Sequence, residues 1–210
     1  MKDYLLLGKR IITSESEIVF EYHGEPNFKD YFDVKLGEWK YENGVLIGTE
    51  LENRGGIILT KKKFDYDIML TFKISTVLPA TRDLNAVWCT EWNEETNYLG
   101  NSYVCGLNGW YENKAGIERC GDNEFYSSTS LYNYMPGKVV EMTCGSINGH
   151  CFMFVDGVLV SEFKDGFPLK GGYAGISPYC TSLQITDVVI RKIKWEKRKQ
   201  RYEPDLYKKR

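Results

Sequence analysis

Three glutamates in the middle of the chain have the residue type and spacing that best suit acid–base chemistry. Hydrolysis of a glycosidic bond usually needs two carboxyl groups, about 5 Å apart for retention of configuration and farther apart for inversion. Glu118 is the candidate proton donor, because apolar neighbours would raise the pKa of its carboxyl group. Glu91 and Glu112 are the candidate partners. The assignment depends on which residues share a strand face, and no local motif supports it.

Aromatic and amide side chains lie close to these glutamates in the sequence. Trp and Tyr rings can stack on sugar rings, although they suit an ordinary protein core equally well. Asn and Arg side chains could bond sugar hydroxyls. The candidate ligand-binding residues are Trp88, Trp92, Asn101, Tyr103, Trp110, Tyr111, Asn113 and Arg119. Concave binding sites pair aromatic walls with a few polar groups, so the cluster predicts a ligand site more strongly than any one member does.

Two expected strands carry most of these side chains. Because side chains alternate along a strand, residues 85–92 would place Glu91 on one face and Trp88 together with Trp92 on the other. Within 110–119, Glu112, Lys114, Gly116 and Glu118 would share one face, and Tyr111, Asn113, Ala115, Ile117 and Arg119 the other. Small, polar and charged residues in mid-strand predict a concave sheet face that is open to a ligand.

Turn dipeptides predict that the rest of the chain is built from antiparallel strands. Asn43-Gly44, Asn148-Gly149 and Asp156-Gly157 each separate apolar runs, and such pairs favour type I′ hairpin turns. In the second hairpin Ile147 should face His150, at a turn that is usually solvated. The segment 121–130 is polar and is expected to be a loop. Helix-forming composition is confined to residues 195–202, where a frayed tail is the alternative.

These patterns together predict one all-β domain, an antiparallel jelly-roll β-sandwich, over residues 1–194. Residues 195–210 are expected to be a basic C-terminal tail, since 191–210 hold ten Lys and Arg residues against three acidic ones. A solvated end is the simple interpretation of that tail, and contact with an anionic partner or a second copy of the chain is the alternative. The near balance of 29 acidic and 27 basic residues in the whole chain argues against a nucleic-acid binder.

The closing part of the sequence resembles a known superfamily. The string Phe163-Lys-Asp-Gly-Phe-Pro-Leu-Lys-Gly-Gly-Tyr-Ala-Gly-Ile-Ser is similar to the last strands of concanavalin A-like lectins and glucanases. The strings Gly100-Asn-Ser-Tyr-Val-Cys-Gly-Leu-Asn-Gly-Trp-Tyr and Ala115-Gly-Ile-Glu-Arg resemble an uncharacterised bacterial group found among sugar-utilisation enzymes, related to 3-keto-disaccharide hydrolases. The resemblance implies a concanavalin A-like fold and a carbohydrate ligand.

The resemblance leaves the activity open. Laminarinase-type members of the superfamily carry Glu-x-Asp-x-x-Glu or Glu-x-Asp-x-Glu on one strand, and in Glu91-Trp-Asn-Glu-Glu an Asn stands where the central Asp should be. We therefore expect a carbohydrate-directed protein, as an intracellular enzyme that cleaves a small glycoside or oligosaccharide. The alternatives are a non-catalytic lectin-like domain and a subunit of a larger sugar-processing complex.

Cysteine usage and the N-terminus bear on where the protein works. The six cysteines form no CxxC or zinc pattern, and we expect them to be free thiols in a reducing cytoplasm. The N-terminal apolar run is too short for a signal peptide, and no stretch approaches the ~20 apolar residues of a membrane span. The resemblance also suggests Ca²⁺ as a cofactor, because the superfamily often binds it, with Asp187 and Asp122-Asn123 as candidate ligands. Homo-oligomerisation is also possible.

Overall fold

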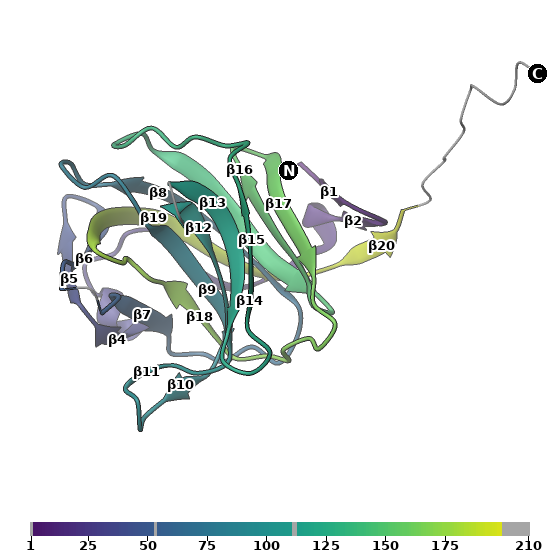
Figure 1. Ribbon diagram of the computed structural model, residues 1–210, viewed down its shortest axis with the longest axis horizontal. Coiled ribbons are helices and arrows are strands. Elements are labelled where there is room, and N and C mark those ends of the chain that lie inside the picture. The colour runs from purple at the N-terminus through teal and green to yellow at the C-terminus, as the bar shows by residue number, and fades with distance from the viewer. Residues whose placement is uncertain (1, 53, 111–112, 199–210) are drawn as a thin grey trace, which may run out of the picture.

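The computed structural model describes residues 2–52, 54–110 and 113–198, and its main body is two antiparallel sheets packed face to face (Figure 1). One sheet has seven strands in the order β14-β13-β12-β9-β18-β7-β4. Their bounds are β4 Phe32–Leu36, β7 Ile57–Thr60, β9 Leu84–Thr90, β12 Ser102–Gly109, β13 Lys114–Cys120, β14 Phe125–Thr129 and β18 Tyr173–Ile176.

The second sheet has eight strands, in the order β17-β16-β15-β8-β19-β6-β5 with β3 also paired to β19. Their bounds are β3 Glu17–Tyr22, β5 Glu38–Glu42, β6 Val45–Glu50, β8 Ile68–Thr76, β15 Val140–Ile147, β16 His150–Val155, β17 Val158–Lys164 and β19 Thr181–Lys192. Two short 3-10 helices, Thr13–Glu15 and Phe28–Asp30, are the helical segments of the described residues. The prediction of an all-β jelly-roll sandwich is confirmed.

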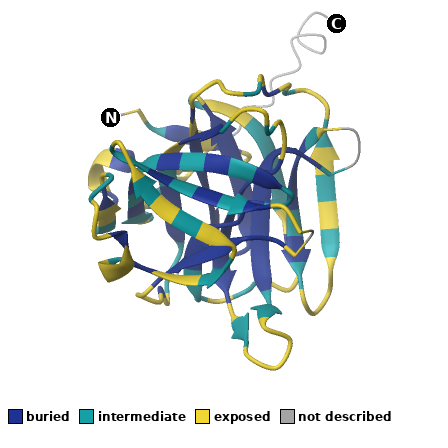
Figure 2. Ribbon diagram, turned by 90° about the vertical axis from the view of Figure 1, so that its left-hand side faces the viewer, coloured by how far each residue is buried: buried dark blue, intermediate teal, exposed yellow. Residues whose placement is uncertain are grey.

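The main core lies between the two sheets, because each sheet turns alternate side chains inward (Figure 2). On β8 the alternating residues Ile68, Leu70, Phe72 and Ile74 are all buried in this core. At one edge, Phe125 on β14 stacks on Phe163 of β17 with 3.8 Å between ring centroids. The segment 121–130 was expected to be a loop, and this contact explains why part of it is instead an edge strand.

The predicted hairpins are confirmed. Both central residues of each turn have positive φ, for example 48° at Asn148 and 72° at Gly149. The β15–β16 register places Ile147 opposite His150, as the sequence predicts. His150 itself is buried rather than solvated, because Lys9 from an N-terminal strand reaches it, with 2.9 Å between Lys9 Nζ and His150 Nδ1.

A small third sheet covers the far side of the eight-stranded sheet. It consists of β1 (Tyr4–Leu6), β2 (Lys9–Ile11) and β20 (Trp195–Lys197), in that order (Figure 1). Its apolar residues pack on a buried cluster that includes Met69, Phe152 and Phe154. Residues 195–197 therefore form a strand, where the sequence suggested a helix or a frayed tail. Residues 199–210 of the expected tail lie outside the described residues.

All six cysteines are free in the structure, in agreement with the sequence expectation. Within the described part of the chain, no helix is both long and apolar enough to cross a membrane.

Candidate functional site

The face of the seven-stranded sheet that points away from the core holds the candidate site. Cross-strand pairing aligns Val87, Val104, Glu118 and Tyr126 in one row on neighbouring strands. Val87 and Val104 are buried with Ile57 and Leu59 in a separate apolar cluster. Half-buried residues pack against that cluster, among them Trp92, Tyr98, Leu99, Trp110 and Tyr173. Tyr98 and Leu99 form β11, which pairs with β10 (Trp92–Asn93). We call this surface the outer face.

Trp110 and Glu118 make the central contact of the outer face. Trp110 Nε1 donates a hydrogen bond of 2.6 Å to Glu118 Oε2. A Cβ placed on Gly116 would lie 2.8 Å from Trp110 Cδ2, so glycine lets the indole ring lie directly against β13. The sequence predicts that Gly116 and Glu118 share a face, and the structure confirms it. The contact fixes one oxygen of Glu118 and leaves the carboxyl group half-buried.

Burial is the main reason that the pKa of Glu118 is raised. Hydrogen bonds from Trp110 and Cys120 oppose the shift, and the negative charges of Glu124 and Asp83 add to it. A pocket of about 470 Å³ opens beside the carboxyl group; its lining includes Glu118, Glu124 and Tyr126. Glu118 therefore keeps its proton to a higher pH than an exposed glutamate would, at the edge of a space that a sugar ring could enter.

Glu124 and Tyr126 are site residues that the sequence analysis missed. Glu124 is exposed, and Tyr126 is exposed to 60 % on β14, directly opposite Glu118 in the register. The polar composition of 121–130 hid this edge strand. In the structure Phe125, Ser127 and Thr129 are half-buried and Tyr126 and Ser128 are exposed, but the sequence Phe-Tyr-Ser-Ser-Thr has no alternation of apolar and polar residues that could have revealed the strand.

Asp83 and Asn85 extend the outer face toward the start of β9, and the sequence analysis did not identify Asp83 either. Burial raises the pKa of Asp83, although the Arg82 guanidinium lies 2.6 Å from its carboxylate. Asn85 is 7 % exposed, and its Oδ1 has no hydrogen-bond partner among the described residues. Gly106 lies opposite Asn85 and leaves room for that amide.

Trp88 and Tyr103 are core residues, which corrects their prediction as ligand-binding side chains. Both are fully buried, with ring centroids 5.5 Å apart. Trp88 Nε1 donates to Ser146 Oγ across the sandwich at 3.1 Å. Strand alternation identifies residues that share a face, but both faces of β9 are apolar, so the sequence could not tell which one is the core.

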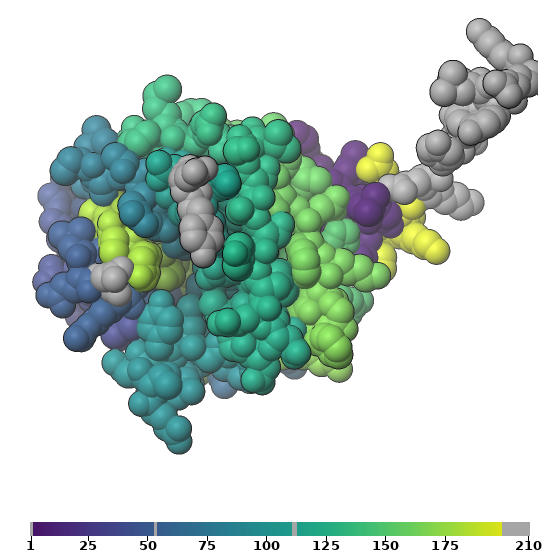
Figure 3. Space-filling view, in the orientation of Figure 1, coloured from purple at the N-terminus to yellow at the C-terminus, as the bar shows by residue number. Residues whose placement is uncertain are grey.

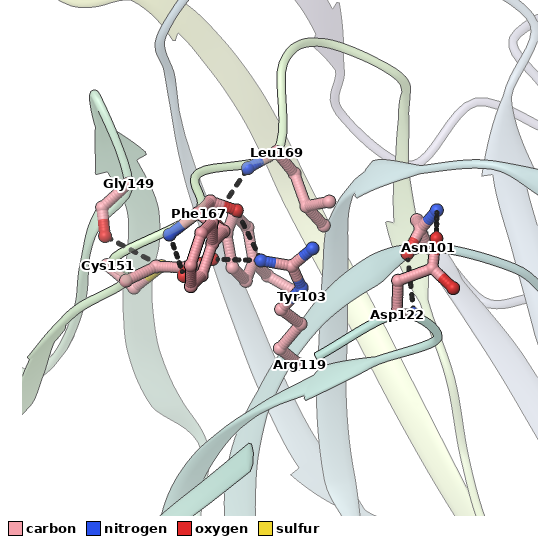
Figure 4. A network of polar contacts seen from close by, with 9 residues as sticks. Asn101, Tyr103, Arg119, Asp122, Gly149, Cys151, Phe167 and Leu169 are labelled. Atoms are coloured by element: carbon pink, nitrogen blue, oxygen red, sulfur yellow. Dashed lines mark hydrogen bonds and ion pairs between the residues drawn. The ribbon is translucent and has the colours of Figure 1, made fainter. Parts of the chain in front are cut away.

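Arg119 is also inside the sandwich, where it forms an ion pair (Figure 4). Its Nη1 lies 2.7 Å from Asp165 Oδ2 and also donates to the carbonyl of Phe167. Tyr103 donates to the same Asp165 oxygen at 2.7 Å and accepts from the Leu169 amide at 2.9 Å. These contacts hold the loop between β17 and β18 onto the sheet, so the Arg119 guanidinium has a structural role, although Arg119 also lines part of the pocket beside Glu118.

A bulge at Cys89 separates Trp88 from Trp92, which simple alternation would place together. Cys89 has φ of 49°, and the pairing of β9 with β18 shifts register at this point. Trp92 therefore packs on the outer-face cluster while Trp88 points into the core. Lys35 Nζ lies 5.3 Å from the centroid of the Trp92 ring.

The remaining candidates lie at the periphery. Asn101 donates to Glu91 Oε2 and Asp122 Oδ2 at 3.4 Å each, and Glu91 and Asn113 are exposed. Glu91 is not among the charges that shift the pKa of Glu118. Tyr111 and Glu112 lie outside the described residues.

A metal ion has no evident site among the described residues, since no group of three His, Cys, Asp or Glu side chains is placed to hold one. Asp187 is bonded to Lys73 at 2.8 Å, and Asp122 lies beside Asn101. Calcium binding stays a prediction from the sequence.

Comparison with solved structures identifies the fold as a galectin-like and concanavalin A-like sandwich. Carbohydrate-binding module CBM66 from Bacillus subtilis is similar with a TM-score of 0.61 and 13% identity, over 81% of this chain and 96% of that one. An endo-β-1,3-glucanase from Pyrococcus furiosus gives 0.62 and 12%, over 91% and 98%. A Bacillus subtilis protein of unknown function with a galectin-like fold gives 0.64 and 10%, over 84% and 96%. No family model matches the sequence, and no curated protein matches it.

Proposed function

We propose that the protein is a carbohydrate-directed enzyme that cleaves a small glycoside or oligosaccharide on the outer face, with Glu118 as proton donor. The observation that carries the proposal is the Glu118 carboxyl group, whose pKa is raised by burial and which Trp110 holds at 2.6 Å beside an open pocket. The fold supports the substrate class, since both a carbohydrate-binding module and a glucanase share it. Free thiols support action inside the cell.

In this mechanism a sugar ring rests on the exposed Tyr126 ring, and the glycosidic oxygen faces Glu118. Glu118 gives its proton to that oxygen as the bond to the anomeric carbon breaks. Glu124 lines the same pocket and is the proposed base, which takes a proton from the water that attacks the anomeric carbon. Trp110 is a positioning residue, because it bonds Glu118 and does not line the pocket.

The test is mass spectrometry of plain and 3-keto glycosides incubated with the purified protein. We expect a cleaved product with the native chain, loss of that product with Glu118→Gln, and retained activity with the matched control Glu91→Gln, since Glu91 does not line the pocket beside Glu118. Equal turnover by Glu118→Gln and the native chain would contradict the role of Glu118.

A lectin-like binding domain is the second candidate, and the exposure of Tyr126 beside a carboxylate favours it. Glycan binding that survives Glu118→Gln and falls with Tyr126→Ala, without turnover by any variant, would identify a binding domain.

A further inference from the structure

A second pocket lies at an end of the sandwich, where the β15–β16 turn meets the loop between β17 and β18. Its volume is about 330 Å³, at the small end of the range for ligand sites. It shares no lining residue with the pocket beside Glu118. Its lining includes Tyr66, Asp67, Cys89, Asn148, Leu169 and Gly171. We propose that this pocket is a separate binding site for a small neutral polyhydroxylated ligand, such as a single sugar ring.

Asp67 supplies the polar anchor of this pocket. Its Oδ1 accepts a hydrogen bond of 3.0 Å from the Asn148 backbone amide, which fixes the carboxylate. No hydrogen bond to its Oδ2 occurs among the described residues. The side chain is half-buried, and burial raises its pKa, while the Asn148 amide and the charge of Lys9 oppose the shift. A carboxylate with one fixed and one unused oxygen is suited to accept hydrogen bonds from neighbouring hydroxyl groups.

The walls of the pocket are held in place before any ligand arrives. The Leu169 amide donates to the buried Tyr103 hydroxyl at 2.9 Å, and Phe64 and Gly172 exchange backbone hydrogen bonds of 2.9 and 2.8 Å. Lys192 Nζ lies 4.8 Å from the centroid of the Tyr66 ring. Preorganised walls reduce the entropy cost of binding, which a small ligand with few contacts could not otherwise offset.

The charges around the pocket favour a neutral ligand. Asp65 and Lys170 also line it, Lys9 acts on Asp67, and Lys192 lies over the Tyr66 ring, so two acidic groups face three basic ones and the net charge is small. Burial raises the pKa of the Cys89 thiol to about 12, so Cys89 is an uncharged part of the wall and not a nucleophile. The apolar surfaces of Tyr66 and Leu169 complement the C–H face of a sugar ring.

The experiment is amide NMR of the full chain titrated with glucose, galactose, mannose and fructose. We expect at least one sugar to shift the amides of Tyr66, Asp67 and Gly171. Asp67→Asn keeps the acceptor for the Asn148 amide and replaces the unused oxygen, and it should weaken binding roughly tenfold or more, as expected for a hydrogen bond to a charged group.

Two further variants separate this site from the outer face and from a folding defect. Asn148 has φ of 48°, which glycine adopts freely, so Asn148→Gly should keep the turn and the backbone amide that bonds Asp67. The substitution removes the side-chain amide of Asn148 from the pocket wall and should therefore weaken binding. Glu118→Gln should leave these shifts unchanged, whatever it does to turnover. Absence of shifts with all four sugars, or equal affinity in the native chain and the folded Asp67→Asn and Asn148→Gly variants, would overturn the proposal.

Discussion

At the scale of single residues, the contact between Trp110 and Glu118 combines two opposite effects on one carboxyl group. Burial raises the pKa of Glu118, and the indole N–H lowers it by bonding the charged form. The balance of these two effects sets the pH at which Glu118 gives up its proton. Trp110 therefore adjusts the pKa of Glu118 without lining the pocket itself.

Trp110→Phe should therefore raise the pKa of Glu118 further, because it removes the donor and keeps an aromatic ring. An NMR titration of the Glu118 side-chain carboxyl would measure the shift. Trp92→Phe is the matched control, since Trp92 packs on the same cluster and has no part in the Glu118 hydrogen bonds. The same titration midpoint in Trp110→Phe and the native chain would rule out this tuning role.

The buried ion pair of Arg119 and Asp165 is expected to contribute strongly to the free energy of unfolding. Asp165→Asn leaves the Arg119 charge inside the sandwich without its partner, and should cost about 3–5 kcal/mol of unfolding free energy. Asp156→Asn is the control, because the Asp156–Lys138 pair is exposed and should cost less than about 1 kcal/mol. Urea unfolding of both variants measures the difference, and similar costs would contradict the structural role of the pair.

The Asp165 carboxyl group should also make the free energy of unfolding depend on pH. Burial raises the pKa of Asp165, but hydrogen bonds from Phe167, Tyr103 and Arg119 outweigh burial and lower it. A carboxyl group whose pKa is lowered in the folded state stabilises the protein at any pH above its pKa in the unfolded chain, which is about 4. That stabilisation is lost as the pH falls through the folded-state pKa. Unfolding free energies of the native chain should therefore decline below pH ~4 more steeply than those of Asp165→Asn, and parallel curves would contradict this.

At the scale of elements, the N-terminal sheet is attached to the sandwich through a histidine. His150 Nδ1 accepts from Lys9 Nζ at 2.9 Å, its Nε2 lies 2.8 Å from Glu162 Oε2, and the Leu7 amide donates to the same Glu162 oxygen. Burial lowers the pKa of His150, and the Lys9 charge lowers it further, while Glu162 opposes the shift. The attachment therefore needs a neutral imidazole.

A histidine with a lowered folded-state pKa binds its proton more readily in the unfolded chain. The contribution of His150 to the free energy of unfolding should be fully present at a pH above its pKa in the unfolded chain, which is about 6.5. It should decrease as the pH drops toward the folded-state pKa. Thermal melts between pH ~7 and ~5 should show this decline in the native chain and a smaller one in His150→Gln. Equal pH dependence in both proteins would show that His150 does not govern the attachment.

Elements defined by local chemistry were the ones that could be predicted. Asn-Gly and Asp-Gly turns fix their own backbone angles, so three hairpins and the β15–β16 register follow from a few adjacent residues. The edge strand β14 could not be predicted in this way, since its pairing with β13 and its contact with Phe163 come from distant parts of the chain. The Cys89 bulge likewise depends on β18.

At the scale of the whole molecule, two sheets enclose the core without a covalent link among the described residues. The fold class could be predicted, because it depends on the number and spacing of strands. The assignment of Trp88, Tyr103 and Arg119 could not, because it depends on which sheet face meets the other sheet. Alternation gives the relative orientation of side chains, and only packing decides which orientation is inside.

The free thiols give a prediction for the entire fold. A reducing agent should leave the thermal midpoint of the native chain unchanged, since no cysteine is paired. Thiol titration in denaturant without reductant should find all six cysteines. A midpoint that falls on reduction, or a titre below six, would contradict the structure.

The third sheet has a consequence for the order of events during synthesis. Its middle strand, β2, is synthesised long before its partner β20, which ends at Lys197. Until translation has passed that residue, the nascent chain lacks the strand and the Trp195 ring that pack beside β2. A chain released from the ribosome with its last residue shortly before 195 would contain every strand of both large sheets and still expose part of this apolar surface to chaperones.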